Sequence, residues 1–161
     1  MAGARRSGGS GDGFITVADG SARWGRYGAA GVLARHVDAD GDVAFFLARR
    51  SLHTHNGGTW AIPGGALDAD EEPLEGALRE FVEEIGVDLD SYEVVHVHED
   101  DHGGWSYWTL VVDVPHRFDL PDTSLNWETS EVRWVKASEL GDLELFGAFR
   151  ATLHRLQLLD G

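Results

Sequence analysis

A glycine pair followed by an acidic, amphipathic segment constrains the fold of this chain more than any other stretch. Residues 63–86 read PGGALDADEEPLEGALREFVEEIG, with Pro73 suited to a first helical turn and Gly86 suited to the position after the last. At about 100° per residue, the apolar side chains between them form one stripe, made of Leu74, Ala77, Leu78, Phe81, Val82 and Ile85. The segment therefore predicts a helix over residues 73–85, with this stripe packed in a core.

Three glutamates fall on the other side of this predicted helix. Glu80, Glu83 and Glu84 share an arc of about 100°, and like charges at this spacing repel one another by about 0.2–0.5 kcal/mol per pair. Arg79, four residues before Glu83, offsets only part of the repulsion. Two interpretations stay open, a solvated acidic face or a set of oxygen ligands for a hard cation such as Mg²⁺. The glycines before the helix would let a backbone approach such an ion closely.

The rest of the chain predicts one domain with an α/β fold. With 161 residues, 42% of them hydrophobic, the chain is long enough for a single core. Residues 1–13 are rich in glycine and serine and are expected to form a flexible tail, followed by a single domain over residues 14–161. Hairpin signals such as Asp40-Gly41 and a second helical pattern over residues 147–159 favour a central mixed sheet with helices on its faces.

Charge and composition exclude several classes of function. The chain has 28 acidic and 13 basic residues and a net charge of −15, so we expect no nucleic-acid-binding face. No apolar run reaches the roughly 18 residues that a membrane span needs, and no apolar segment follows the N-terminal arginines as a secretory signal requires. The absence of cysteine excludes disulfides and thiolate metal sites. A cytoplasmic protein is expected.

The spacing of the charged residues in the predicted helix is specific. Gly65 is followed by five residues, Glu71, seven residues and then REFVEEIGV from Arg79 to Val87. This pattern resembles a complete Nudix box, the signature of the Nudix hydrolase family, with every fixed position filled. The preceding GTWAIPGG and the later EVRWVKASEL are similar to segments that flank the box in that family, so that the resemblance covers most of residues 27–140.

The resemblance implies a Nudix-type α/β/α sandwich and hydrolysis, dependent on Mg²⁺ or Mn²⁺, of the diphosphate linkage in a nucleoside diphosphate derivative. By position in the box, it implies that Glu80, Glu83 and Glu84 bind metal and that Gly64 adds a backbone carbonyl ligand. Glu80 and Glu83 are also implied to be catalytic, with Glu80 the first choice for the general base that deprotonates water.

Four further residues of the motif are given roles by the resemblance. Arg79 is implied to lie beside the catalytic glutamates and to belong to the catalytic group. Together with Glu71 it is also implied to hold the loop before the helix in shape. Gly65 and Gly86 are implied to be structural positions of the motif.

Outside the box the candidates have ordinary alternatives. Trp127, Glu128 and Glu131 are candidates for substrate binding. Trp127 could stack on a nucleobase or pack as a lid, and the two glutamates could also serve as base or metal contact or be exposed acids. His96 and His98 alternate along a predicted strand, so both point to one face, either as ligands or as solvent-facing polar residues.

The retained carboxylates favour an enzyme over the main alternative, a non-catalytic Nudix-like module that binds or senses a nucleotide. Such modules usually lose carboxylates of the box. The expected partner is a small-molecule nucleoside diphosphate substrate of nucleotide or nucleotide-sugar type, and a homodimer is left open. The sequence does not identify the substrate.

Overall fold

The structure is a computed structural model that describes residues 9–54, 56–119 and 128–159. A mixed sheet forms its centre, with strands in the order β5-β4-β3-β8-β7, β6 paired with β3 and β9 paired with β4. In this sheet β3 and β8 run parallel, and the other paired strands run antiparallel. The strands are β3 (Ala29–Val37), β4 (Val43–Arg50), β5 (Trp60–Ala61), β6 (Gly64–Ala66), β7 (Glu93–Asp101), β8 (Ser106–Asp113) and β9 (Thr129–Lys136).

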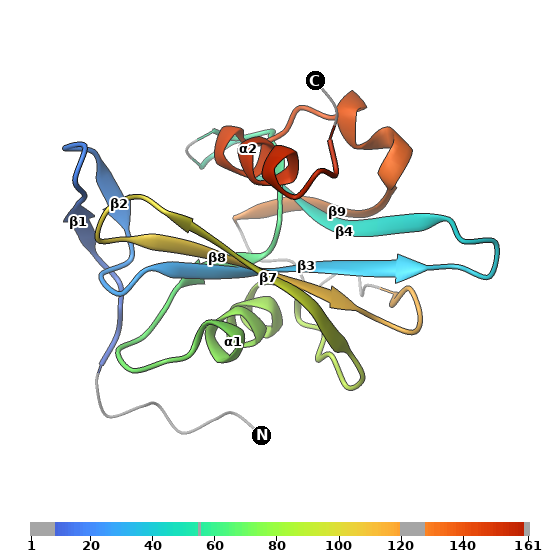
Figure 1. The fold of residues 1–161 in the computed structure, drawn as a ribbon, viewed down its shortest axis with the longest axis horizontal. Helices are drawn as coiled ribbons and strands as arrows, with labels where there is room; N and C mark the ends of the chain where they lie inside the picture. The colour runs from blue at the N-terminus through green and yellow to red at the C-terminus, as the bar shows by residue number, and fades with distance from the viewer. Residues whose placement is uncertain (1–8, 55, 120–127, 160–161) are drawn as a thin grey trace.

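Helices cover both faces of the sheet (Figure 1). On one face α1 (Pro73–Ile85) packs against the strands through Phe81. On the other face lie α2 (Gly147–Arg155), which packs through Phe149, and the 3-10 helix η1 (Ala137–Asp142). Within the described ranges, no helix is long and apolar enough to span a membrane. The expected α/β/α sandwich around a mixed sheet is confirmed.

The first helix has both of the ends that the sequence predicts, whereas the second has only the predicted start. The residue after α1, Gly86, has a left-handed φ of 80°, which glycine adopts without strain. α2 ends at Arg155, four residues short of the predicted pattern. The chain turns there because Gln157 has a φ of 60° and the Leu158 amide donates to the Leu153 carbonyl at 2.9 Å.

The face that α1 buries is the predicted one except at one edge. Ala77, Phe81 and Ile85 of the predicted stripe are buried, but Val82, expected in the core, is 42% exposed, and Gly76, outside the stripe, is buried. Two small residues let this side of the helix approach the neighbouring elements closely. Their position also turns Glu80 and Glu84 partly inward, so that two of the three glutamates are not on a solvated face.

A separate hairpin precedes the sheet, and residues 9–13 before it are hydrogen-bonded to the residue that follows it. The hairpin consists of β1 (Phe14–Thr16) and β2 (Ala22–Trp24), and the amide of Gly25 donates to the carbonyl of Gly13 at 2.7 Å. Residues 9–13, which the sequence assigns to a flexible tail, therefore contact the rest of the protein. The division of the chain into a tail and one domain stays a prediction.

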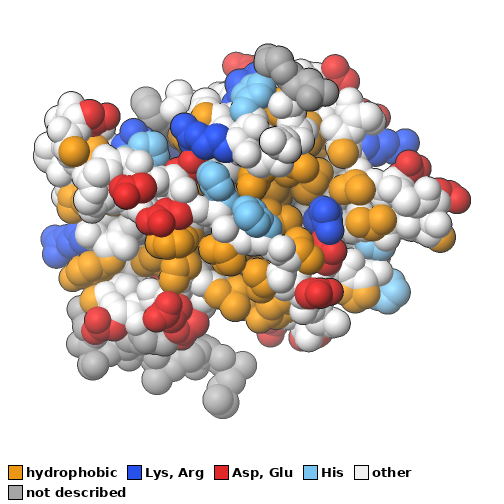
Figure 2. Space-filling model, viewed as in Figure 1, with side chains coloured by type: hydrophobic (Ala, Val, Ile, Leu, Met, Phe, Trp, Pro, Cys, Tyr) orange, Lys and Arg blue, Asp and Glu red, His pale blue; other side chains and the backbone are white. Residues whose placement is uncertain are grey.

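β7 forms one edge of the sheet and carries exposed apolar side chains. Val95 and Val97 are 39% and 47% exposed on it. Figure 2 shows hydrophobic side chains gathered over the middle of the face seen in Figure 1, with acidic groups around them.

Candidate active site

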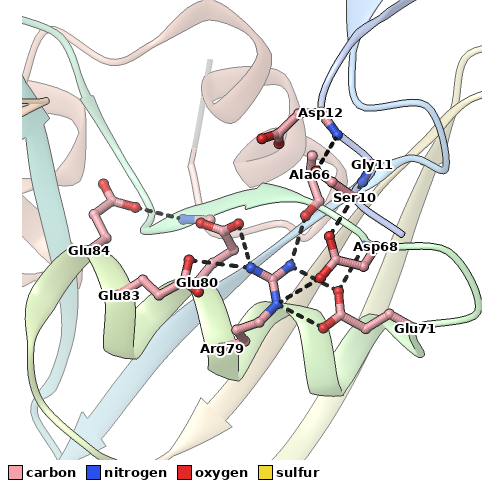
Figure 3. A network of polar contacts seen from close by, with 11 residues as sticks. Ser10, Gly11, Asp12, Ala66, Asp68, Glu71, Arg79, Glu80, Glu83 and Glu84 are labelled. Carbon is pink, nitrogen blue, oxygen red and sulfur yellow. Dashed lines mark hydrogen bonds and ion pairs between the residues drawn. The ribbon is translucent and has the colours of Figure 1, made fainter. Parts of the chain in front are cut away.

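Arg79 of α1 holds the loop that leads from β6 to the helix. Its Nε and Nη2 donate to the two carboxylate oxygens of Glu71, at 2.8 and 2.9 Å, and Nη2 also donates to the Ala66 carbonyl at 3.0 Å. Glu71, whose side chain is only 7% exposed, accepts a further bond from the Asp68 amide at 2.9 Å. These bonds, above all those to Glu71, raise the pKa of Arg79 above its usual range. The loop–helix junction therefore encloses a permanently charged, bidentate ion pair (Figure 3).

Glycines set how closely this loop lies on its neighbours. A Cβ on Gly65 would lie 2.5 Å from the carboxyl carbon of Glu80, and one on Gly64 would lie 2.6 Å from the Ala30 carbonyl oxygen. In α1, a Cβ on Gly76 would meet the side chains of Leu67 and Glu71. Gly65 therefore makes room for Glu80, and Gly64 lets the loop lie close to β3. The role of Gly76 was not predicted, although a glycine inside an amphipathic helix is a signal for close packing.

Glu80 and Glu84 are the carboxylates that the helix turns inward. Burial raises the pKa of Glu80 to about 7, in spite of the opposing charge of Arg79, whose Nη1 donates to it at 3.0 Å. Burial likewise raises the pKa of Glu84 to about 7, although Thr129 Oγ1 and the Gly64 amide donate to it at 3.0 and 3.1 Å. Repulsion between the two glutamates contributes to the raised pKa of Glu84.

The third glutamate of the cluster lies farther out. The side chain of Glu83 is 59% exposed and accepts a bond from Arg79 Nη1 at 3.3 Å. The same Arg79 nitrogen thus donates to both Glu80 and Glu83, which draws these two carboxylates together and leaves Glu84 on the side of Gly64 (Figure 3).

A cavity of about 1000 Å³ opens beside these carboxylates and extends between the sheet and α2. Glu80, Glu84 and Gly64 lie at one part of its wall, and Tyr107 and Thr109 of β8 form part of its floor. Burial, with the charge of Glu84, raises the pKa of the Tyr107 hydroxyl above its usual range. The cavity has the size of a pocket for a small organic ligand.

A group of polar contacts joins β7 to α2 at the wall of this cavity. Asp100 of β7 accepts a hydrogen bond from Thr152 Oγ1 at 2.7 Å and pairs with Arg155 and with His98 Nε2, the latter at 3.1 Å. Burial of this carboxyl opposes ionisation, but the bonds from Thr152 and His98 outweigh it and lower the pKa of Asp100. His96 stacks on His98 with ring centroids 6.4 Å apart, so both rings lie on one side of the strand.

Of the two candidate glutamates outside the box, one lines the cavity and the other does not. Glu128 lines the cavity, and its charge contributes to the raised pKa of Glu84. Glu131 lies outside the cavity lining and pairs with Arg133 at 2.8 Å and with Arg49 at 4.0 Å. Trp127 lies outside the described residues. Thr129, the hydrogen-bond donor to Glu84, was not predicted, and nothing in its local sequence distinguishes it.

The donor set fits a divalent ion that keeps part of its water shell. Among the described residues, no three acidic or histidine side chains converge on one point, because Arg79 and Thr129 draw the glutamates to different sides. Mg²⁺ is commonly held by one or two carboxylates together with water and substrate phosphates, and all the donors here are oxygens. Glu80 and Glu84, with raised pKa values and facing one cavity, suit such a site.

Comparisons with known proteins show the family of this chain. The NUDIX domain family model matches residues 27–156. A Mycobacterium tuberculosis protein named "Putative 8-oxo-dGTP diphosphatase 3" is 43% identical over 155 residues, which cover 92% of this chain and 70% of that protein. The crystal structure of the Nudix hydrolase RenU from M. smegmatis has a TM-score of 0.81 at 35% identity, covering 91% of this chain and 93% of RenU. A Caenorhabditis elegans Ap4A hydrolase shares the fold, with a TM-score of 0.63 at 17% identity over 80% of this chain and 95% of that one. The chain therefore belongs to the Nudix hydrolase family.

Proposed function

We propose that this Nudix hydrolase cleaves a phosphoric anhydride bond in a small nucleoside diphosphate derivative with the help of Mg²⁺ or Mn²⁺. The observation that carries the proposal is the pair Glu80 and Glu84, two inward-facing carboxylates with raised pKa values beside a cavity of ligand size. Two like charges so placed repel each other unless a proton or a cation joins them. A phosphate-bearing substrate and its divalent ion would supply the cation.

A nucleoside triphosphate is the substrate class that we place first. Support comes from the M. tuberculosis relative named for 8-oxo-dGTP and from a Proteus vulgaris 8-oxo-dGTP diphosphatase, 46% identical over 57 residues. The cavity of about 1000 Å³ is large enough for a nucleoside next to the carboxylates. Nucleotide sugars form the second class to test.

The glutamates of the box would have two roles, which are binding the metal ion and accepting a proton from water. A bound divalent ion would neutralise phosphate charge and lower the pKa of water. Glu80 and Glu84 would hold the ion, and Glu83 would join them when it leaves Arg79. Glu80 would also accept the proton of the attacking water, because it lines the cavity beside the ion that it would hold. The water oxygen bonds to phosphorus as the bridging anhydride oxygen leaves.

Steady-state hydrolysis of a nucleotide panel tests the proposal. Nucleoside triphosphates, diphosphates and nucleotide sugars are incubated with Mg²⁺ or Mn²⁺, and phosphate-containing products are quantified. We expect Glu83→Gln and Glu84→Gln to lower kcat by at least about 100-fold, because each removes a carboxylate from an ion that would supply several kcal/mol of transition-state stabilisation. Glu93→Gln, an exposed acid at the start of β7, is the matched control and should retain full activity.

The non-catalytic alternative predicts a different pattern. A sensor module would bind one of these nucleotides but release no product with either metal. Turnover that is equal in the wild type, Glu83→Gln and Glu84→Gln with metal saturating would show that the carboxylates are not the catalytic site.

A further inference from the structure

The N-terminal segment, residues 9–13, is fastened to the loop that precedes α1. The Gly11 amide donates to Asp68 Oδ1 at 3.3 Å, while the other Asp68 oxygen lies 3.6 Å from Arg79 Nε. Gly11 is buried, and a Cβ on it would overlap the Leu67 carbonyl oxygen. Asp68 therefore joins the N-terminal segment to the arginine that organises the box (Figure 3).

This attachment places Asp12 beside the carboxylates of the box. Asp12 lines the same cavity as Glu80 and Gly65, and its negative charge is among those felt by Glu80. Figure 3 shows its carboxylate above the loop at Ala66, on the side of the helix from which Glu80 rises. No described residue forms an ion pair with it or donates a hydrogen bond to its carboxylate.

Asp12 and Glu128 each act on one of the two inward glutamates. Asp12 acts electrostatically on Glu80, and Glu128 acts on Glu84 from the loop before β9. Both side chains are exposed and line the cavity. Each of these carboxylates adds negative charge beside Glu80 or Glu84. Such charge repels an anionic ligand unless a cation lies between them.

We propose that Asp12 is a further carboxylate of the divalent-metal site, held beside Glu80 by the N-terminal segment. The inference rests on the proposed function, because it takes the metal site of the box as given. Asp12 adds negative charge to the metal site from the N-terminal segment, whereas the glutamates reach the site from α1. Its carboxylate accepts hydrogen bonds from the water ligands that Mg²⁺ and Mn²⁺ retain. The N-terminal segment thus contributes a side chain to the metal site.

Direct binding of Mn²⁺ tests this role without requiring turnover. Free Mn²⁺ is measured by electron paramagnetic resonance during titration of the wild type, Asp12→Asn and Asp40→Asn. Asp40, on the turn between β3 and β4, is the control, since its exposed carboxylate lies outside the cavity lining and the substitution changes the charge equally. We expect Asp12→Asn to raise the Kd about tenfold, the effect typical of losing an outer partner of a metal site.

A second variant tests the attachment itself. Gly11→Ala should raise the Kd for Mn²⁺ in the same way as Asp12→Asn, because the new Cβ pushes the segment away from the Leu67 carbonyl. Combining the two substitutions should add little to either alone. Melting temperatures of each variant show that the fold is kept.

The outcomes separate this inference from the proposed function. If the wild type binds Mn²⁺ and hydrolyses nucleotides, but Asp12→Asn binds Mn²⁺ as tightly as Asp40→Asn does, the role of Asp12 is disproved and the proposed function stands. If the wild type itself neither binds Mn²⁺ nor hydrolyses any nucleotide, the proposed function fails and the role of Asp12 fails with it.

Discussion

The two carboxylate oxygens of Glu71 accept hydrogen bonds from Nε and Nη2 of Arg79, at 2.8 and 2.9 Å. These bonds cross the junction between the loop and α1. The pair links Glu71, two residues before α1, to the second turn of the helix, next to Glu80 and Glu83. Because the Glu71 side chain is 7% exposed, this ion pair is shielded from water on one side. It fixes where the glutamates of the helix stand relative to Gly64 and Gly65.

Breaking this pair should destabilise the protein. Glu71→Gln leaves a half-buried guanidinium without its main partner, and we expect the free energy of unfolding to fall by about 2 kcal/mol. Arg79→Lys should also lower stability, because an ammonium cannot bind two carboxylate oxygens in parallel. Urea unfolding measures both, with Glu93→Gln as the control. Variants within about 0.5 kcal/mol of the wild type would show that the pair does not hold the junction.

Gly76→Ala should destabilise the protein although alanine is the better helix former. Helix propensity alone predicts a gain of about 1 kcal/mol. The structure predicts a loss, because the Cβ would meet Leu67 and Glu71 at the junction. Gly147→Ala is the matched control, since it lies at the start of α2 with no atom within 4 Å of its Cβ position. A higher melting temperature for both variants would contradict the close packing of α1 on this loop.

The metal-free protein should lose stability as the pH rises from about 5 to 8. The pKa values of Glu80 and Glu84 are raised from 4.5 to about 7, so the folded protein binds more protons than the unfolded chain in this window. The stabilisation is complete below the unfolded pKa and is lost as the pH passes the folded one. Urea unfolding in EDTA at several pH values measures the slope.

The double variant Glu80→Gln/Glu84→Gln provides the test of that assignment. Its free energy of unfolding should depend much less on pH over this window, while Glu93→Gln should keep the slope of the wild type. A double variant with an unchanged slope would mean that other groups carry the pH dependence.

How much of this site could be predicted from the sequence depends on the type of interaction. Pro73 and Gly86 act locally, so the bounds of α1 followed from the sequence. The face that α1 buries depends on contacts across the fold, and Val82 was therefore placed wrongly in the core. The spacing of the box gave the family, whereas Thr129 reaches Glu84 from 45 residues away and left no local signal.

The N-terminal segment shows the same limit. Glycine and serine there predict mobility. The hydrogen bonds from the Gly11 amide to Asp68, 57 residues along the chain, and from the Ala69 amide to the Gly9 carbonyl show that the segment meets the box. Contacts of this range depend on the whole topology. A pattern within one element cannot reveal them.

Divalent ions should stabilise the fold through the same glutamates. A ligand that binds only the native state adds about 2.7 kcal/mol at a hundredfold excess over Kd, which is about 5–10 °C in melting temperature for a domain of this size. We expect this rise with millimolar Mg²⁺ or Mn²⁺ in the presence of a non-hydrolysable nucleotide. The rise should be much smaller in Glu80→Gln/Glu84→Gln. Equal shifts in the wild type and the double variant would mean that these carboxylates form only a solvated face.

The position of bond cleavage tests the central claim most directly. The protein is incubated with Mg²⁺ and a nucleoside triphosphate in H₂¹⁸O, or with a nucleotide sugar if that class is the one turned over, and the products are analysed by mass spectrometry. Attack of water on phosphorus predicts one ¹⁸O on a product phosphate. Formation of that product should fall at least about 100-fold in Glu84→Gln, because the ion loses a carboxylate ligand. Label on a sugar carbon, or equal product formation by Glu84→Gln, would contradict carboxylate-assisted hydrolysis of a phosphoric anhydride.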